Sequence, residues 1–238
     1  MGWGIRKVLG MCLLAIISWA ANAAEDLSQL YSPEVIGDRL IIKGHIDSHI
    51  YDYFSLEAAR LKQIKVIEFN SYGGKFDVAM AVAQKIRFMH VTTKLSSGSV
   101  CASVCVLMYA AGETRVADAG TWFGIHGARL TPGLANRFLD ACYDGAAFSP
   151  RLKSCAVFEA KWEPYIQKAT NEWFDFYESM GVSSALRATY FALSDDPEWY
   201  EQMNLLKKPD FVLPAEEAYN LNLVTQLNPF VTVSLHEN

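Results

Sequence analysis

Hydrophobic and polar residues alternate along this chain in short blocks whose period changes between two and about 3.6 residues. Runs rich in β-branched and aromatic residues, ended by glycine, proline or polar clusters, predict strands at 39–43, 64–69, 91–95, 121–125, 211–213 and 223–227. Apolar positions at helical spacing predict helices at 48–61, 104–111 and 215–221, and one with Val78, Val82, Ile86 and Met89 on a single face. This alternation predicts an α/β fold with a mainly parallel sheet flanked by helices, and such a sheet is expected to be covered on both faces.

The middle of the chain, about 129–200, follows a different pattern. It begins polar and then predicts a helix at 156–180, ended by Gly181, and a shorter helix at 183–193. We find no convincing strand there, so we interpret it as an enlarged helical insertion in a single domain spanning 24–238. Residues 24–36 are expected to form a loose lead-in, and a polar turn is expected to join 104–111 to 121–125.

The N-terminus has the pattern of a targeting segment. Arg6 and Lys7 precede an apolar run over 8–19, and a small-x-small motif follows at 21–23. Residues 1–23 are therefore predicted to be a cleavable signal peptide, with an uncleaved anchor as the alternative. A periplasmic or secreted location is the expected consequence.

Composition narrows the class of protein. The chain has 238 residues, of which 51% are hydrophobic and 20% charged, which suits one domain with a sizeable core. Its net charge of −5, without a cluster of Lys and Arg, argues against nucleic acid as a partner.

Four cysteines remain after the predicted signal peptide, and an oxidising compartment would allow them to pair. Cys142–Cys155 is the preferred bridge because it closes a short loop. Cys101 and Cys105 are the second candidate pair, although an i, i+4 spacing on a regular helix would strain a bridge. No second Cys/His cluster has ligand spacing, so no metal site is expected.

The candidate chemistry lies between residues 96 and 127. A run of small residues leads to Ser103 at a predicted helix start, and His126 ends a predicted strand. A serine hydroxyl needs an adjacent imidazole to become a useful nucleophile near neutral pH, so we interpret these two as a candidate nucleophile and base. The N–H of Val104 would point toward an oxyanion at the helix start. Each residue also has a structural interpretation, Ser103 as a helix cap and His126 as a buried, hydrogen-bonded histidine.

A second candidate element is the turn Asn-Ser-Tyr-Gly-Gly at 70–74. Two glycines after a strand let the backbone approach a ligand and aim an N–H group at it, so Gly73 is a candidate substrate-binding residue. A tight strand-to-helix turn without function would have the same sequence.

In this order, the Gly-Gly turn, the serine segment ending Ala-Ala-Gly, the Ile-His strand and the motif AEEAYNLNLV resemble the proteolytic subunit of the Clp protease, in the crotonase-like superfamily. The resemblance covers about 39–126 and 210–224. It implies a crotonase/Clp-protease-like fold with Ser103 as nucleophile and His126 as base. It further implies that Gly74 and Val104 donate oxyanion N–H groups and that Asp210 orients His126. Asp195 and Asp196 are alternatives for the orienting acid.

Three departures from that family stand out. Tyr72 replaces the usual proline of the turn, cysteines bracket Ser103, and the segment after His126 is enlarged. In the family that segment stacks rings, so ring assembly is in doubt and a homo-oligomer is an open alternative. Export would also separate the chain from ATP, so no ATPase partner is expected.

The sequence therefore predicts an exported serine peptidase that hydrolyses peptide bonds in peptide or protein substrates without a cofactor. The main alternative is a catalytically inactive binding protein of the cell envelope on the same scaffold, with the serine helix locked by a Cys101–Cys105 bridge. An acyl-thioester enzyme and a Ser–Lys peptidase are further alternatives.

Overall fold

The computed structural model describes residues 33–128, 152–194 and 211–229, without the side chains of 152–159, 162 and 194. Its elements, in chain order, are β1 (Glu34–Ile36), β2 (Arg39–Ile46), α2 (Ser48–Leu56), α3 (Ala58–Leu61), β3 (Val66–Gly74), α4 (Phe76–Met89), β4 (Thr92–Leu95), β5 (Val100–Ala102), α5 (Val104–Ala110), β6 (Thr114–Asp118), β7 (Trp122–Ile125), α7 (Leu152–Ser179), α8 (Ala185–Ser194), β8 (Phe211–Pro214), α10 (Ala215–Asn220) and β9 (Gln226–Asn228). The predicted signal peptide, Cys142, Asp195, Asp196 and Asp210 lie outside the described residues.

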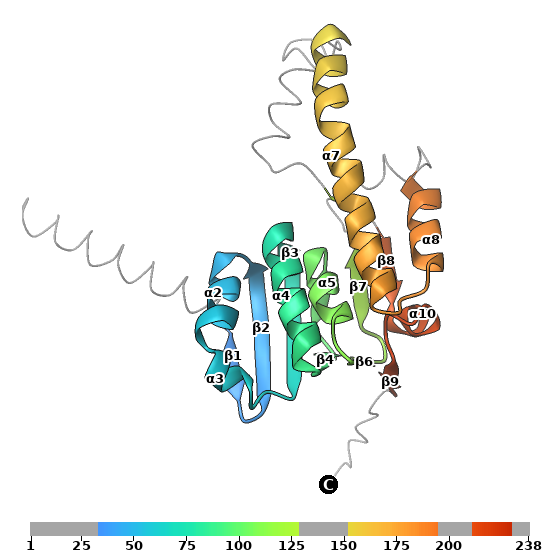
Figure 1. The fold of residues 1–238 in the computed structure, drawn as a ribbon. Coiled ribbons are helices and arrows are strands. Elements are labelled where there is room, and N and C mark those ends of the chain that lie inside the picture. Colours follow the sequence, from blue (N-terminus) through green and yellow to red (C-terminus); the bar gives the residue numbers. More distant parts are fainter. Residues whose placement is uncertain (1–32, 129–151, 195–210, 230–238) are drawn as a thin grey trace, which may run out of the picture.

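The strands form one mainly parallel sheet in the order β8-β7-β5-β3-β4-β6-β9, with β2 on β3 and β1 on β2 (Figure 1). Only the pairs β1–β2 and β7–β8 are antiparallel among the described strands. The first half of β3 pairs with β4, and Ser71 in its second half pairs with Cys101 of β5. This division lets β3 run through both parts of the sheet. The predicted fold class, a mainly parallel sheet with flanking helices and a helical insertion after the histidine strand, is confirmed.

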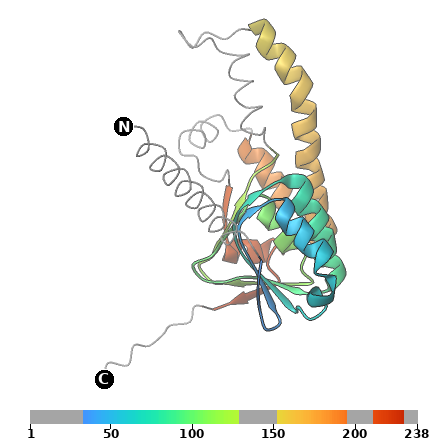
Figure 2. The ribbon, with the colours of Figure 1, turned by 90° about the vertical axis from the view of Figure 1, so that its left-hand side faces the viewer.

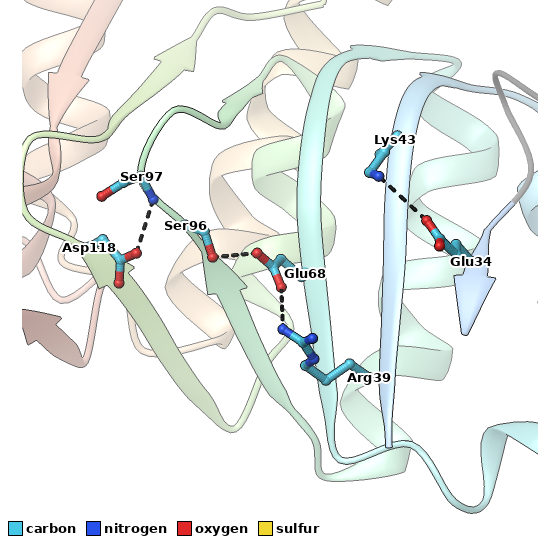
Figure 3. A network of polar contacts seen from close by, with 7 residues as sticks. All are labelled: Glu34, Arg39, Lys43, Glu68, Ser96, Ser97 and Asp118. Carbon is cyan, nitrogen blue, oxygen red and sulfur yellow. Dashed lines mark hydrogen bonds and ion pairs between the residues drawn. The ribbon is translucent and has the colours of Figure 1, made fainter. Parts of the chain in front are cut away.

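The prediction that helices cover both faces of the sheet is wrong for β2, β3 and β4. Side chains on these strands alternate between buried and accessible positions, as in Ile67, Glu68 and Phe69. Helices α2, α4 and α5 lie against one side of the sheet (Figures 1 and 2). The opposite face carries polar side chains, of which Arg39 and Lys43 are exposed and Glu68 is half-buried (Figure 3). Polar residues on one side of a strand remove the driving force for a second helical layer.

Most predicted elements are present, with shifted ends. Helix 48–61 divides into α2 and α3 at Glu57, and β3 continues through the predicted turn to Gly74. That continuation contains an irregularity in the pairing with β2, between Lys43 and His45, which absorbs an extra residue.

Three strands were missed. Residues 34–36 form β1 instead of a loose lead-in, 100–102 form β5, and 114–118 form β6 instead of a polar turn. These strands are short, and they form because neighbouring strands complete their hydrogen bonds, as β4 and β9 do on either side of β6.

The insertion is helical over its described part, as predicted. Helix α7 spans 28 residues with Pro164 inside it, and its first part projects away from the sheet (Figure 1). Its last part is buried through Trp173, Phe174, Phe176 and Tyr177, which join the main core. Helices α7 and α8, here called the helical arm, are thus anchored at one end.

Candidate active site

The carboxyl ends of β3, β5 and β7 meet at one edge of the sheet. Strand β5 lies between the other two and is parallel to both, with Cys101 opposite Ser71 on one side and Phe123 on the other. Because parallel strands end at the same edge, the residues after β5 and β7 are brought together there. Ser103 follows β5 and His126 follows β7.

Ser103 occupies a sharp turn between β5 and α5. Its backbone has φ 59° and ψ −134°, a conformation that few residues other than glycine adopt. Its N–H donates to the carbonyl of Gly124 on β7 at 2.7 Å, and its carbonyl accepts from the N–H of Val106 at 3.0 Å. The side chain is half-buried, so the hydroxyl stands at the sheet edge with access to solvent.

The two cysteines that bracket Ser103 form a disulfide. Cys101 lies on β5 and Cys105 on α5, with their Cα atoms 5.3 Å apart, and both are fully buried. The expectation of strain was wrong because it assumed that both cysteines lie on one regular helix. The turn at Ser103 instead brings strand and helix together. The Cys142–Cys155 pairing lies outside the described side chains.

Gly73 is packed directly against Ser103. A Cβ atom placed on Gly73 would lie 2.5 Å from Ser103 Cβ and 2.9 Å from Ser103 Oγ, so no larger residue fits without movement. Its φ of 101° also favours glycine. The Gly73 N–H donates to Ser71 Oγ at 3.0 Å, and the Ser71 hydroxyl donates to the Gly44 carbonyl at 2.5 Å.

The two predicted oxyanion donors lie on either side of this contact. Gly74 packs against β2, where an added Cβ would be 2.0 Å from the Ile46 carbonyl oxygen. Val104 is the first residue of α5 and is buried.

The small-residue run before β5 is held by hydrogen bonds to two strands, β3 and β6. Ser96 donates to Glu68 of β3, whose carboxylate also pairs with Arg39 of β2 at 3.5 Å (Figure 3). The N–H of Ser97 donates to Asp118 of β6 at 3.0 Å (Figure 3). These contacts direct the chain from β4 into β5 and so help to place Ser103.

His126 is half-buried at the end of β7. Its Nδ1 is 2.6 Å from the carbonyl oxygen of Gly127, and because a carbonyl only accepts, Nδ1 carries the hydrogen. In the neutral imidazole, Nε2 then has the lone pair, which is the tautomer that a general base needs. The ring packs edge-on against Trp173, at 5.5 Å between centroids, and Trp173 contacts Phe76 in the same way.

The contacts of the helical arm with the histidine segment were missed from sequence. Thr170, Trp173 and Tyr190 lie 44 or more positions after His126 and carry no local motif. Only the aromatic spacing of the 156–180 helix indicated that one face of it is buried.

The described part of the chain contains no group of three or more His, Cys, Asp or Glu side chains placed to hold a metal ion. None of its helices combines the length and apolarity that crossing a membrane requires.

No protein-family model matches the chain, and no curated protein matches it. Two solved structures have similar backbones. A mutant of the 1510-N membrane-bound stomatin-specific protease is 17% identical with a TM-score of 0.46, covering 80% of this chain and 78% of that one. A mutant of ClpP1 from Listeria monocytogenes is 19% identical with a TM-score of 0.44, covering 82% of this chain and 92% of that one. Scores this low assign no activity, so the interpretation of the site depends on its own geometry.

Proposed function

We propose that this protein is an exported serine peptidase that hydrolyses peptide bonds with Ser103, His126 and Asp210. The observation that carries the proposal is the arrangement of β5 and β7. Ser103 and His126 directly follow these adjacent parallel strands, and a hydrogen bond from Ser103 N–H to the Gly124 carbonyl joins the two strands.

The conformation of Ser103 supports the role of nucleophile. A positive φ at a strand-to-helix junction presents a serine hydroxyl at the top of a sheet, as in the nucleophile turn of other serine hydrolases. Such strain persists only where the surrounding structure enforces it, and it concentrates at functional sites. Here Gly73 and the Cys101–Cys105 bridge enforce it.

In the proposed reaction, Ser103 Oγ attacks the substrate carbonyl while His126 Nε2 takes the hydroxyl proton. The N–H groups of Gly74 and Val104 stabilise the negative charge on the carbonyl oxygen. His126 then returns the proton to the leaving amine, and water releases the acyl group by the reverse sequence. Asp210 is proposed to stabilise the imidazolium through its negative charge, while the Nδ1 hydrogen stays with the Gly127 carbonyl, and no cofactor takes part.

The proposed location is the periplasm or the exterior of the cell. The basic and apolar pattern of residues 1–23 supports export, and the disulfide beside Ser103 supports an oxidising compartment. The substrates would accordingly be extracytoplasmic peptides or proteins.

A fluorophosphonate probe, which forms a covalent bond with activated serines, tests the proposal. The purified protein is expected to be labelled, with the adduct mapped to Ser103 by mass spectrometry. The Ser103→Ala variant is expected to lose the adduct, and His126→Gln to slow labelling on the order of 10⁴-fold. Asp210→Asn and Asp195→Asn distinguish the two acidic candidates. A wild-type protein that remains unlabelled where a control hydrolase reacts would refute the proposal.

The second candidate is a non-catalytic binding protein on the same scaffold. The buried bridge between Cys101 and Cys105 favours it, because a covalently fixed serine turn suits a rigid binding surface as well as a reactive one. This alternative predicts no labelling of Ser103, with or without reduction of the bridge.

A further inference from the structure

The segment after His126 is held by the helical arm through hydrogen bonds to its backbone. The N–H of Gly127 donates to the Tyr190 hydroxyl at 2.8 Å, and the N–H of Ala128 donates to Thr170 Oγ1 at 2.9 Å. Thr170 lies on α7 and Tyr190 on α8, so both helices contribute. Buried and half-buried backbone N–H groups require such partners.

The fit around Gly127 is close. A Cβ atom there would lie 2.6 Å from the Tyr190 hydroxyl oxygen and 2.7 Å from Thr170 Oγ1. The arm therefore holds both peptide groups that flank Gly127: Tyr190 accepts from the peptide before it, and Thr170 accepts from the peptide that contains the Gly127 carbonyl. This is the same residue whose carbonyl oxygen accepts from His126 Nδ1.

The imidazole ring is also supported directly by the arm. Trp173, which is 2% exposed, packs edge-on against His126 and against Phe76 at the start of α4. The ring is thus held by a packing contact from α7 in addition to the hydrogen bond from its own Nδ1.

The arm is itself rigid where it makes these contacts. The ring of Tyr190 packs on the buried Phe174 at 5.0 Å between centroids. Arg187 on α8 pairs with Asp175 and Glu178 on α7. Helix α8 is therefore fixed on α7, and the Tyr190 hydroxyl on α8 is fixed relative to the Thr170 hydroxyl on α7.

We infer, on the basis of the proposed function, that Thr170, Tyr190 and Trp173 are positioning residues for His126. Thr170 and Tyr190 hold the two peptide groups that flank Gly127, so that the Gly127 carbonyl keeps the hydrogen on Nδ1 and the lone pair on Nε2. Trp173 sets the plane of the ring. The insertion thus completes the candidate base, a role different from that of a lid or an assembly handle.

The test removes the two hydroxyls and preserves the surrounding shape. The variant Tyr190→Phe/Thr170→Val keeps the aromatic ring and the branched side chain. Tyr53→Phe is the matched control because its buried hydroxyl has no hydrogen-bond partner in the described part of the chain. Two readouts are taken: the tautomer of His126 from its ring ¹⁵N chemical shifts, assigned with His126→Gln, and the rate of fluorophosphonate labelling.

The wild type and Tyr53→Phe are expected to show the Nδ1–H tautomer and equal labelling rates. The double variant is expected to shift toward a mixture of tautomers and to be labelled about 10²-fold more slowly, the typical effect of misplacing a catalytic group by about 1 Å. Tyr190→Phe alone is expected to show a smaller change in the same direction, and it serves if the double variant folds poorly.

An unchanged tautomer in a folded double variant would overturn the inference. If the wild type is never labelled but the tautomer still shifts in the double variant, the proposed function fails while the positioning role stands. The two failures are therefore distinguishable.

Discussion

At the scale of single residues, the candidate site depends on how closely the chain approaches itself at Ser103. Only glycine fits at position 73. A side chain there would overlap Ser103, and the positive φ of the backbone also favours glycine. The turn at 70–74 can therefore approach Ser103 this closely only because Gly73 has no side chain.

Replacing Gly73 by alanine tests this contact. The added methyl would overlap Ser103 Cβ and the Ala102 carbonyl oxygen, so Gly73→Ala is expected to lower the free energy of unfolding by about 2 kcal/mol or more and to slow labelling of Ser103. Gly37→Ala is the matched control, since Gly37 also has a positive φ but no atom within 4 Å of its added Cβ. It is expected to cost about 1 kcal/mol and to leave labelling unchanged. Urea denaturation and probe kinetics measure both effects, and equal labelling in the two variants would contradict the steric argument.

Asp118 gives a prediction for the dependence of stability on pH. Burial acts to raise the pKa of its carboxyl, but hydrogen bonds from Asn228 and the Ser97 N–H, with the nearby charge of Lys94, outweigh it and lower the pKa below the ordinary value of 3.8. A lowered folded-state pKa stabilises the fold above pH 3.8, and this contribution is lost as the pH falls through the folded-state value.

The stability difference between the wild type and Asp118→Asn should therefore be largest above pH 5 and shrink as the pH falls below about 4. Urea unfolding at a series of pH values between 7 and 2 measures it. A difference that stays constant or grows toward low pH would show that the charge of Asp118 is not involved.

At the scale of elements, the junction of β5 and α5 is constrained by burial and by a covalent bridge. Both elements are short, at three and seven residues, and every residue of the two is buried. The Cys101–Cys105 bridge joins β5 to α5 across the turn at Ser103 and so adds a covalent restraint to this junction.

Removing this bridge should destabilise the protein. The double variant Cys101→Ala/Cys105→Ala is expected to lose about 2 kcal/mol of unfolding free energy, because the short cross-linked loop regains freedom in the unfolded chain. Urea denaturation of the wild type under reducing conditions should give the same midpoint as the variant. The urea midpoint of the variant should not depend on this bridge when reductant is added. A variant as stable as the oxidised wild type would refute a structural role for the bridge.

At the scale of the whole molecule, one buried arginine connects the sheet to the arm and to the C-terminal segment. Arg115 on β6 is 3% exposed and donates to the carbonyls of Gly112, Met180, Asn222 and Leu223, at 2.7 to 3.3 Å. Burial lowers the pKa of its guanidinium. These carbonyls come from the end of α5, the end of α7 and the loop after α10, so a single side chain joins three distant parts.

Arg115→Met should consequently lower the unfolding free energy by about 3 kcal/mol or more, since buried carbonyls would lose their donor. Arg115→Lys should recover only part of the lost unfolding free energy, because a single ammonium group cannot donate to as many of these carbonyls as the planar guanidinium does. The control Arg60→Met removes an exposed ion pair with Glu57 and is expected to change stability by less than about 0.5 kcal/mol. Thermal and urea denaturation measure the series, and similar losses at positions 60 and 115 would contradict the connecting role of Arg115.

Much of the architecture was predictable from the sequence because it is encoded locally. The short β-branched apolar runs at 39–43 and 64–69, and the helical spacing around Val82 and Ile86, locate these strands and this helix. The residue types around Ser103 and His126 likewise identified the candidate pair. The exposed faces of β2 and β3 were misjudged because the parallel pairing suggested burial on both sides, although Arg39, Lys43 and Glu68 in the same strands are polar.

By itself, then, the sequence determined the α/β class, the principal strands and helices, and which serine and histidine to examine, because each of these depends on neighbours a few positions away. The tertiary structure alone decided that Cys101 bonds to Cys105 across a turn, that Gly73 rests on Ser103, and that Thr170, Trp173 and Tyr190 support His126. The Gly73 and arm contacts join residues about 30 or more positions apart, and the bridge depends on a backbone turn that residue spacing does not reveal. Such contacts form only when the whole core has packed and the loop-closure entropy has been overcome.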